Sequence, residues 1–522
     1  MESRDGRALR RSRLLLALSS STVLFALFAA PSRPVVDGAS GSCARLAAAG
    51  LQETTITSTE LVAAGDSRFS AAHSFCRVTL TIAPTIDSDI RVEVWLPVDG
   101  WNGRFQAVGN GDAAGVISYQ AMARALDRGY ATSSTDTGHA GNSMAFALGH
   151  REKYIDFGYR AVHQMTVKAK AILTMFYGTA PRVAIWNGCS QGGRQGVTEA
   201  ARYPADYDAI IAGAPALDYM ELHAARMALN VFVHRSLDSY IPPEKYPAIH
   251  RAALGACDAA DGVKDGSIED PRHCRFDPGV LRCADGDAPS CLTAEQIETA
   301  RGLYTPITDR STGRVVAPAL LEPGSELGWA RLAGPEPLRN AIEPFKYVVF
   351  EDPKWDWRAF NLVADLPRAL RTDGGVINLT DPNLKPFFDR GGKLLMYHGW
   401  ADPQITPLNS VKYFNDVLTA VGDGARGRSI ELYMEPGVSH CWGGDGPDTF
   451  DAIGAVDQWM ESGVAPARIV ASHWTDAGVD RTRPLCPFPQ VATYKGVGSI
   501  NAAENFRCAA GAASDRDAVR RN

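Results

Sequence analysis

The sequence has no excess of basic residues, no internal repeat, no low-complexity tract and no long apolar run after residue 30. Its formal net charge of −6 argues against a nucleic-acid-binding domain, which more often carries a basic surface. No segment after residue 30 is apolar for long enough to cross a membrane. With 522 residues, 45% of them hydrophobic and 21% charged, the composition is that of an ordinary globular protein. The length suits one large domain with an insertion, or two to three smaller domains.

Residues 1–35 have the pattern of a secretory signal peptide. Several arginines between residues 7 and 13 precede an apolar run over residues 14–30, which ends in small residues. A positive start, an apolar middle and a small-residue end are typical of such leaders, and Arg10-Arg11 hints at twin-arginine export. An uncleaved anchor helix is the alternative, but the run is short for a stable span and is diluted by hydroxyl residues. We therefore expect a secreted or periplasmic protein.

The cysteines lack any C-x-x-C pair, which argues against a thiolate metal site. Ten cysteines follow the leader, and an even number in an oxidising compartment predicts five disulfides. The count alone fixes no connectivity. Proximity along the chain favours Cys43–Cys76, Cys257–Cys274, Cys283–Cys291 and Cys486–Cys508, which leaves Cys189 and Cys441 for each other.

Alternating strand-like and helix-like runs predict an α/β fold with a mostly parallel sheet covered on both faces. Short β-rich runs come first, over residues 77–82, 90–96 and 104–108. The later predicted strands are 129–134, 183–186, 209–212, 393–397 and 429–434, and the predicted helices are 159–177, 193–202, 408–418 and 450–462.

The alternation stops after Pro215 and resumes at Lys393. The segment between them looks irregular and is rich in Asp, Gly and Pro, and it contains four of the cysteines. We therefore predict one α/β domain over residues 36–215 and 387–522, interrupted by an inserted lid domain over residues 216–386.

Residues 188–192 read G-x-S-x-G, between a strand-like run and a helix-permissive run. A strand entering such a turn and a helix leaving it expose the serine hydroxyl at the carboxyl edge of the sheet. The hydroxyl needs a base, the base needs an orienting carboxylate, and in such hydrolases the chain order is Ser, then Asp or Glu, then His. Asp402 and His440 each follow a predicted strand in that order, so Ser190, Asp402 and His440 are the predicted triad. The alternative is a glycine-rich turn with an unrelated aspartate and histidine.

Two other histidines are weaker candidates for the base. His139 follows a strand and is expected near the site, whereas His398 lies so close to Asp402 that a packing role is favoured. The oxyanion donors are expected to be the backbone N–H of Gln191 and one N–H of the loop at residues 108–112, from Gly111 or Asp112. A plain tight turn is the alternative for that loop.

Residues 257–267 are dense in carboxylates and turn glycines. Carboxylates and backbone carbonyls on a tight loop suit Ca²⁺, although the spacing is not that of an EF-hand. A solvated acidic turn is the alternative on the sequence alone. The expected ligands are the side chains of Asp258, Asp261 and Asp265 and the carbonyls of Val263 and Ser267.

Taken together, these residues resemble the tannase and feruloyl esterase family of α/β-hydrolases, which also includes a mono(2-hydroxyethyl) terephthalate hydrolase. The resemblance covers nearly all of the mature chain and is most specific at Cys189-Ser190, Asp402 and His440-Cys441. Residues 134–139 and 397–403 are also family-like. The resemblance implies a disulfide between Cys189 and Cys441 beside the triad, and a structural Ca²⁺ in the lid.

Two positions depart from the family pattern in ways that concern the substrate. Asp112 stands where many relatives carry glycine, and Ile405 stands where the terephthalate-monoester hydrolase carries an aromatic residue. In the lid, Trp355, Trp357 and Phe360 are candidates for an aromatic wall against a flat acyl group, or else for lid packing.

The sequence therefore predicts a secreted serine carboxylesterase that acts on small-molecule esters of aromatic, phenolic acids such as feruloyl or galloyl esters. The alternatives are a terephthalate-monoester hydrolase, a peptidase, or a non-catalytic binding protein on the same scaffold. We expect no nucleic-acid partner, and no stable membrane association after the leader is cleaved.

Overall fold

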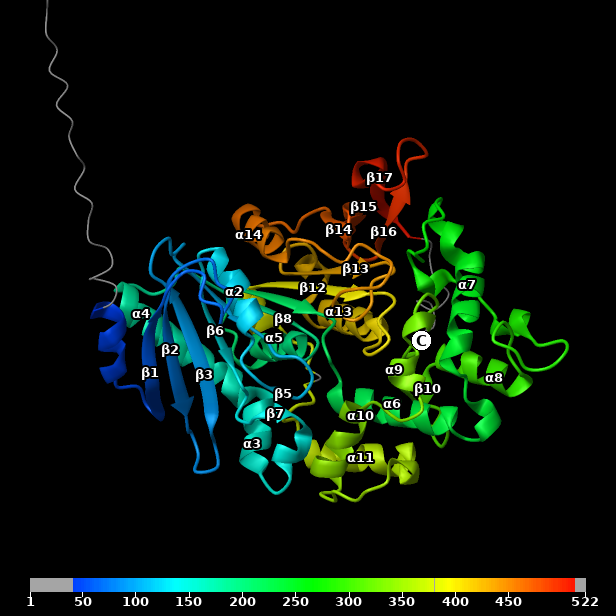
Figure 1. The fold of residues 1–522 in the computed structure, drawn as a ribbon, viewed down its shortest axis with the longest axis horizontal. Helices are drawn as coiled ribbons and strands as arrows, with labels where there is room; N and C mark the ends of the chain where they lie inside the picture. The colour runs from blue at the N-terminus through cyan, green and yellow to red at the C-terminus, as the bar shows by residue number, and fades with distance from the viewer. Residues whose placement is uncertain (1–40, 380, 512–522) are drawn as a thin grey trace, which may run out of the picture.

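The computed structural model describes residues 41–379 and 381–511, so the predicted leader lies outside it. Within these residues, nine strands form one sheet, and the six from β6 to β13 run parallel (Figure 1). Their spatial order is β1 (Thr54–Val62), β2 (Phe75–Ile82), β3 (Ile90–Pro97), β6 (Ala131–Thr135), β4 (Arg104–Val108), β8 (Val183–Cys189), β9 (Ala209–Gly213), β12 (Lys393–Gly399) and β13 (Ile430–Glu435).

Helices cover both faces of this sheet, as the alternation in the sequence predicts. Side chains along a strand point alternately to opposite faces, and Ile210 and Ile211 of β9 accordingly belong to different hydrophobic clusters. The cluster around Ile210 is closed by α4 (Ala161–Tyr177), α5 (Gln191–Arg202) and α13 (Pro407–Val421). The opposite face packs against α2 (Tyr119–Asp127) and α14 (Ala452–Ser462). Both faces of the parallel strands are thus buried, and the chain has an α/β-hydrolase fold.

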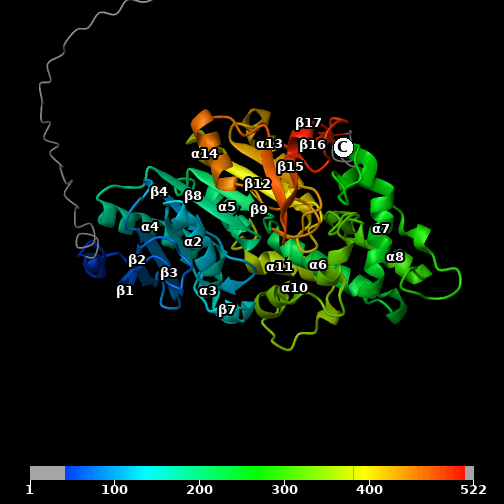
Figure 2. The same cartoon turned by 45° about the horizontal axis from the view of Figure 1, so that its top comes forward.

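Residues 216–386, called the insertion below, separate β9 from β12 and lie beside the sheet in both views (Figures 1 and 2). Their main elements are helical rather than irregular, which corrects the sequence-based expectation. They are α6 (Tyr219–Val233), α7 (Tyr246–Cys257), α8 (Ala294–Leu303), α9 (Ala330–Ala333), α10 (Arg339–Glu343) and α11 (Leu362–Asp373), with a small hairpin of β10 (Ile307–Thr308) and β11 (Val315–Ala317). A short helix, α12 (Lys385–Asp389), leads back to the sheet.

The helical character of α6 is hidden in the sequence because both of its sides are apolar. Met220 and Met227 pack into one hydrophobic cluster, while Leu222 and Leu229 pack into another. A helix that is apolar all round shows no amphipathic stripe, so its period is weak in the sequence. The sequence therefore gives no clear helical signal over α6.

The remaining elements include one outer strand and two C-terminal hairpins that the sequence did not predict. β1 pairs with β2 at the edge of the sheet. The hairpins are formed by β14 (Ile469–Thr475) with β15 (Gly478–Leu485), and by β16 (Gln490–Tyr494) with β17 (Phe506–Ala510). Small elements near the site are β5 (Ala114–Gly115), β7 (Gly141–Asn142) and α3 (Arg151–Ile155). No helix in the described residues combines the length and apolar character that a membrane span needs.

The disulfides confirm the pattern expected from the sequence. All ten cysteines lie in the described residues and pair as Cys43–Cys76, Cys189–Cys441, Cys257–Cys274, Cys283–Cys291 and Cys486–Cys508. Four of these bonds close short loops, whereas Cys189–Cys441 joins residues 252 positions apart. That bond alone connects the segment before the insertion to the segment after it.

Candidate active site

Ser190 sits in the sharp turn between β8 and α5, with φ 63° and ψ −122°. This left-handed φ is rare for a residue with a side chain and marks a strained turn. The turn is held by its neighbours, because the N–H of Ser190 donates to the carbonyl of Gly213 at 2.9 Å. The indole N–H of Trp186 donates to the carbonyl of Gly192 at 2.8 Å.

Close backbone packing explains the glycines around this turn. A Cβ on Gly188 would lie 2.6 Å from the carbonyl carbon of Gly192, and a Cβ on Gly109 would lie 2.6 Å from its Cα. Such separations are far inside van der Waals contact, so only glycine fits at either position. The loop after β4 is thereby pressed against the start of α5, where two oxyanion donors were expected.

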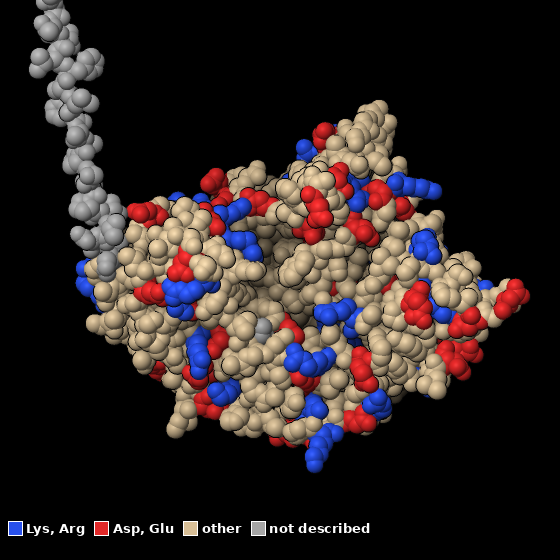
Figure 3. Space-filling view, in the orientation of Figure 1, with Lys and Arg blue, Asp and Glu red and all other residues tan. Residues whose placement is uncertain are grey.

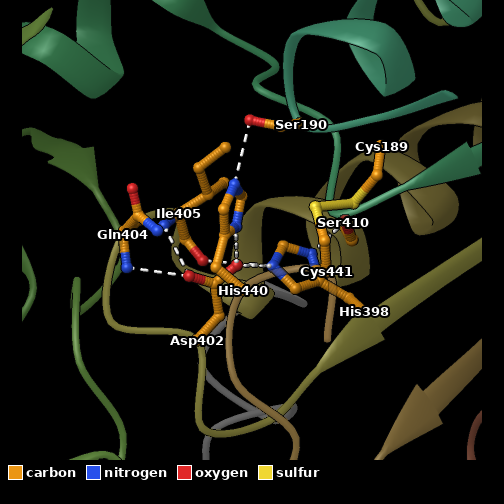
Figure 4. The surroundings of a disulfide bond; sticks show 9 residues. All are labelled: Cys189, Ser190, His398, Asp402, Gln404, Ile405, Ser410, His440 and Cys441. Atoms are coloured by element: carbon orange, nitrogen blue, oxygen red, sulfur yellow. Dashed lines mark hydrogen bonds and ion pairs between the residues drawn. A yellow bond between two sulfur atoms is a disulfide. The ribbon is translucent and has the colours of Figure 1, made fainter. Parts of the chain in front are cut away.

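The structure brings the three predicted triad residues together in one hydrogen-bonded chain (Figure 4). His440 Nε2 lies 2.9 Å from Ser190 Oγ, and His440 Nδ1 lies 2.6 Å from Asp402 Oδ2. Because Nδ1 faces a carboxylate, it carries the ring hydrogen, and the lone pair of Nε2 is left to accept from the serine hydroxyl. This is the arrangement that a general base requires.

Asp402 is fully buried, and donors surround its carboxylate. Oδ1 accepts from the backbone N–H groups of Gln404 and Ile405, at 2.7 and 3.0 Å. Burial opposes ionisation, but the charge of His440 and hydrogen bonds from His398 and His440 outweigh it and hold the pKa of Asp402 well below its usual range. Asp402 is therefore ionised at neutral pH.

His398 is a second partner of Asp402 and not a base. Its Nε2 lies 3.0 Å from Asp402 Oδ2 and 3.1 Å from the carbonyl of Ile405, and both are acceptors. Nε2 therefore carries the hydrogen, and Nδ1 accepts from the hydroxyl of Ser410 at 2.7 Å. Proximity in the sequence suggested packing, whereas the geometry shows that His398 orients the carboxylate. His139 stacks on Phe146, donates from Nε2 to the carbonyl of Ala113 at 2.7 Å, and lines a separate pocket rather than the triad cavity.

The expected oxyanion donors lie at the serine. Gln191 opens α5, where the first N–H groups have no acceptor within the helix. In the loop after β4, the N–H of Asn110 is used by Gln195 Oε1 at 3.1 Å, and the N–H groups of Gly111 and Asp112 donate to no described residue. Gly111 and Gln191 both line the cavity at the serine. The geometry thus leaves Gly111 and Asp112 as the two candidates for the second donor.

Asp112 has φ 55°, in the region that favours glycine, which accounts for the glycine expected at this place in relatives. Its carboxylate accepts from Asn142 at 3.0 Å and from Asn340 of α10 at 2.9 Å. The aspartate therefore connects the oxyanion loop to the insertion, a contact that glycine cannot make.

The triad opens into a cavity of about 1100 Å³ between the sheet and the insertion, and Figure 3 shows the surface hollowed there. The insertion contributes Tyr219, His223, Arg226 and Arg331 to its lining, and Ile405 lines it from the catalytic side. Of the two roles considered for Trp355, Trp357 and Phe360, the structure bears out packing: they lie in a hydrophobic cluster that the insertion shares with residues 113–157 and do not line this cavity.

The acidic loop at residues 257–267 is closed by its disulfide and does not line the triad cavity. Its residues Gly266 and Ser267 instead share a small pocket with Ala401 and Gly437, behind the loops that carry Asp402 and His440. Both oxygens of Asp258 accept backbone N–H groups, from Asp265 and Gly266, and Asp265 pairs with Arg483. Burial, and secondarily the charge of Asp265, raises the pKa of Asp261 to about 6. Three carboxylates on one tight loop offer oxygen ligands of the kind that a divalent cation takes, and Arg481 and Arg483 both lie beside Asp265. No three acidic side chains of the loop converge within 4.8 Å in the described structure, so a bound ion would rely on the carbonyls of Val263 and Ser267 as well.

Comparisons with known proteins agree with this geometry. The family model described as tannase and feruloyl esterase matches residues 76–509. The chain belongs to the tannase and feruloyl esterase family. It is 34% identical to an uncharacterized esterase of Xanthomonas campestris pv. campestris, over 90% of this chain and 91% of the relative. It is also 34% identical to a probable feruloyl esterase B-2 of Aspergillus flavus, over 79% of this chain and 83% of the relative.

Solved structures of the family have the same fold. Feruloyl esterase B from Aspergillus oryzae superposes with a TM-score of 0.85 at 28% identity, over 90% of this chain and 100% of that chain. The tannin acyl hydrolase from Aspergillus niger superposes with a TM-score of 0.76 at 24% identity, over 89% of this chain and 93% of that chain. The family relationship makes this protein a carboxylic ester hydrolase.

The packing of the elbow predicts that Gly109→Ala lowers kcat for ester hydrolysis by about 100-fold, because the new Cβ pushes the oxyanion loop away from the serine. Ester turnover and a thermal melt measure the effect. Gly255→Ala is the control, since a Cβ there meets nothing within 4 Å, and it should leave kcat unchanged. Wild-type turnover in a folded Gly109→Ala protein would contradict the assigned role of this contact.

The long disulfide predicts a second result. Cys189→Ala/Cys441→Ala removes a cross-link over 252 residues and should lower the free energy of unfolding by about 5 kcal/mol in the chain-entropy model. Because both cysteines adjoin the triad, kcat should also fall at least about tenfold. In Cys283→Ala/Cys291→Ala, which opens a loop of 8 residues, about 2 kcal/mol is lost and kcat is kept. Urea unfolding and turnover compare the two variants, and equal kcat values would refute a positional role for Cys189–Cys441.

Proposed function

We propose that this protein is a secreted serine esterase that hydrolyses esters of aromatic, phenolic acids, such as feruloyl or galloyl esters. The observation that carries the proposal is the chain of hydrogen bonds from Ser190 Oγ through His440 to Asp402, at the base of a large cavity beside the oxyanion loop. The relatives that are named as feruloyl esterases support the acyl class. Five disulfides support an oxidising compartment.

The geometry gives each group a role in acyl transfer. Ser190 Oγ attacks the ester carbonyl while His440 Nε2 takes its proton, and the N–H groups of Gln191 and the oxyanion loop hold the developing negative charge. His440 then protonates the leaving alcohol, and an acyl group stays on Ser190. Water, deprotonated by the same nitrogen, releases the acid and restores the serine.

Asp402 supports both half-reactions without exchanging a proton. Its carboxylate stabilises the imidazolium that forms twice in each cycle, and it fixes the tautomer that leaves Nε2 free to act. His398 and the two backbone donors keep the carboxylate in place. A buried charge is tolerated here because every lone-pair direction has a donor.

A second candidate, terephthalate-monoester hydrolysis, is favoured by Arg226. This guanidinium is 4% exposed, lines the cavity and forms no ion pair with any described carboxylate. Burial lowers its pKa to about 10, so the group is cationic at neutral pH. It binds the carbonyl of Gln404 and lies 3.4 Å from Asn340 Oδ1. An acyl group with a second carboxylate would complement this charge.

We also propose that the loop at residues 257–267 binds Ca²⁺ through Asp258, Asp261 and Asp265 with the carbonyls of Val263 and Ser267. The ion would cross-link the loop and take no part in the chemistry. Support comes from the raised pKa of Asp261 among neighbouring carboxylates, and from Ser267 Oγ, which is buried without a hydrogen-bond partner among the described residues.

The triad predicts that Ser190→Ala lowers kcat by about 10⁴-fold or more and abolishes labelling by a serine-directed phosphonate. Ser439→Ala, which alters a serine beside His440 but outside the triad, should keep both ester turnover and phosphonate labelling.

Turnover of methyl ferulate, methyl gallate, chlorogenate and a terephthalate monoester then ranks the substrates. A preference for the terephthalate monoester that Arg226→Gln removes would select the second candidate, and labelled Ser190→Ala would end the assignment of the nucleophile.

The calcium proposal predicts that chelation lowers the thermal midpoint by several degrees, since an ion that binds only the folded state stabilises it. Added Ca²⁺ restores the midpoint of the wild type. Asp261→Asn should melt at the chelated value in either buffer, whereas Asp285→Asn, an exposed change in the same insertion, should respond like the wild type. A midpoint that is indifferent to chelator and to Ca²⁺ would exclude the site.

A further inference from the structure

A second polar cluster lies on the far side of the fold from the triad loops. His163 of α4, Glu199 near the end of α5 and Asp206 just before β9 each present one ligand atom, and the three atoms lie within 4.8 Å of one another. Among the residues that the structure describes, no other group of three or more His, Cys, Asp or Glu side chains is gathered this closely. None of the three lines the catalytic cavity.

Glu199 is the unusual member of this cluster. Its side chain is buried, at 1% exposure, and neither of its carboxylate oxygens accepts a hydrogen bond. An ionised carboxylate cannot stay buried without a compensating charge or donor. Glu199 therefore requires either a proton, shared with Asp206, or a cation.

His163 makes the cluster suitable for a metal rather than for a carboxyl pair alone. Its Nδ1 lies 2.7 Å from Asp206 Oδ2, and its ring stacks on Tyr203 with centroids 3.7 Å apart, which fixes the ring orientation. The imidazole is one-quarter exposed, so the cluster is dry on the Glu199 side and open to water on the His163 side. A bound ion would thus keep a position for a water ligand.

The charges around the cluster leave room for a cation. Lys170 donates to the carbonyl of Asp206 and so uses the backbone rather than the carboxylate. The charges that act on Lys170 are those of Glu199, Asp206 and Asp208, against Arg390. None of these groups donates to Glu199, whose carboxylate oxygens have no hydrogen-bond partner among the described residues.

We propose that His163, Glu199 and Asp206 form a binding site for a divalent transition-metal ion of the Zn²⁺ type. One imidazole nitrogen and two carboxylate oxygens are donors that Zn²⁺ accepts, with water in the fourth position. Metal bonds of about 2.0 Å place neighbouring ligand atoms roughly 3.3 Å apart. The contact between His163 and Asp206 opens by several tenths of an ångström when the ion enters.

The site would cross-link α4 to the end of α5. Because α5 begins at the residue after Ser190, the ion braces the helix that supports the nucleophile, from the end opposite the reaction. An ion that binds only the folded state raises stability without entering the chemistry.

Zn²⁺ binding to the chelator-treated protein tests the proposal, by calorimetric titration and by the thermal midpoint, with Co²⁺ absorption as a report of nitrogen ligation. We expect one Zn²⁺ per chain at this site and a rise in the midpoint. Glu199→Gln and His163→Ala should each weaken binding at least about tenfold. His473→Ala removes a histidine that is paired with Asp480 alone and should leave the affinity unchanged.

Two outcomes overturn the proposal. Equal Zn²⁺ affinity in the wild type and Glu199→Gln would place the ion elsewhere on the chain. Absence of Zn²⁺ binding, with Glu199→Gln as stable as the wild type, would show that Glu199 is protonated and shares its hydrogen with Asp206, because glutamine imitates the neutral acid. Neither readout uses ester turnover, so the result is independent of the proposed function.

Discussion

The backbone of Ser190 is held in a left-handed conformation at the junction of β8 and α5, and the geometry of the site depends on this constraint. The conformation is strained for a serine, so its surroundings must keep it in place. Glycine at positions 109, 188 and 192 allows the β4 loop, the end of β8 and the start of α5 to approach to contact distance. The same approach places the N–H groups of two separate chain segments beside one hydroxyl. Strain and oxyanion binding are thus two results of one packing arrangement.

The second requirement is a buried charge that does not move. Asp402 lies at the end of β12, and His440 lies in the loop after β13, the neighbouring parallel strand. Parallel pairing therefore brings the acid and the base to the same edge of the sheet as the serine. Four donors compensate the carboxylate, and two of them are backbone groups of its own loop. The Cys189–Cys441 bond then fixes the distance between the serine turn and the histidine loop. No backbone hydrogen bond joins these two segments in the described structure.

Much of this arrangement could be predicted from the sequence because its signals are local. An apolar run before residue 188, and aspartate and histidine after later strands, are visible without a structure, and so is the adjacency of Cys189 to Ser190. The role of His398 was not visible, since a histidine four residues from an aspartate has many possible conformations. The placement of Trp357 and Phe360 depended on tertiary packing, which no local pattern in the sequence encodes. Both side chains lie in a hydrophobic cluster that also contains Tyr154 and Phe157 of the α/β domain, where burial of their area stabilises the contact between the two parts.

The insertion contributes to the chemistry through polar rather than aromatic residues. Asn340 accepts from Arg226 and donates to Asp112, so a single amide touches both the cationic wall of the cavity and the oxyanion loop. Asp112 adopts a backbone conformation that favours glycine, and its side chain is what reaches Asn340. Glycine at this position would keep the turn but would lose the hydrogen bond to Asn340 of the insertion. In this chain, Asn340 connects Arg226, which lines the substrate cavity, to Asp112 of the oxyanion loop, which is expected to stabilise the transition state. Differences in specificity between this chain and its relatives should therefore appear in kcat as well as in KM, because a change in the insertion is felt at the oxyanion loop.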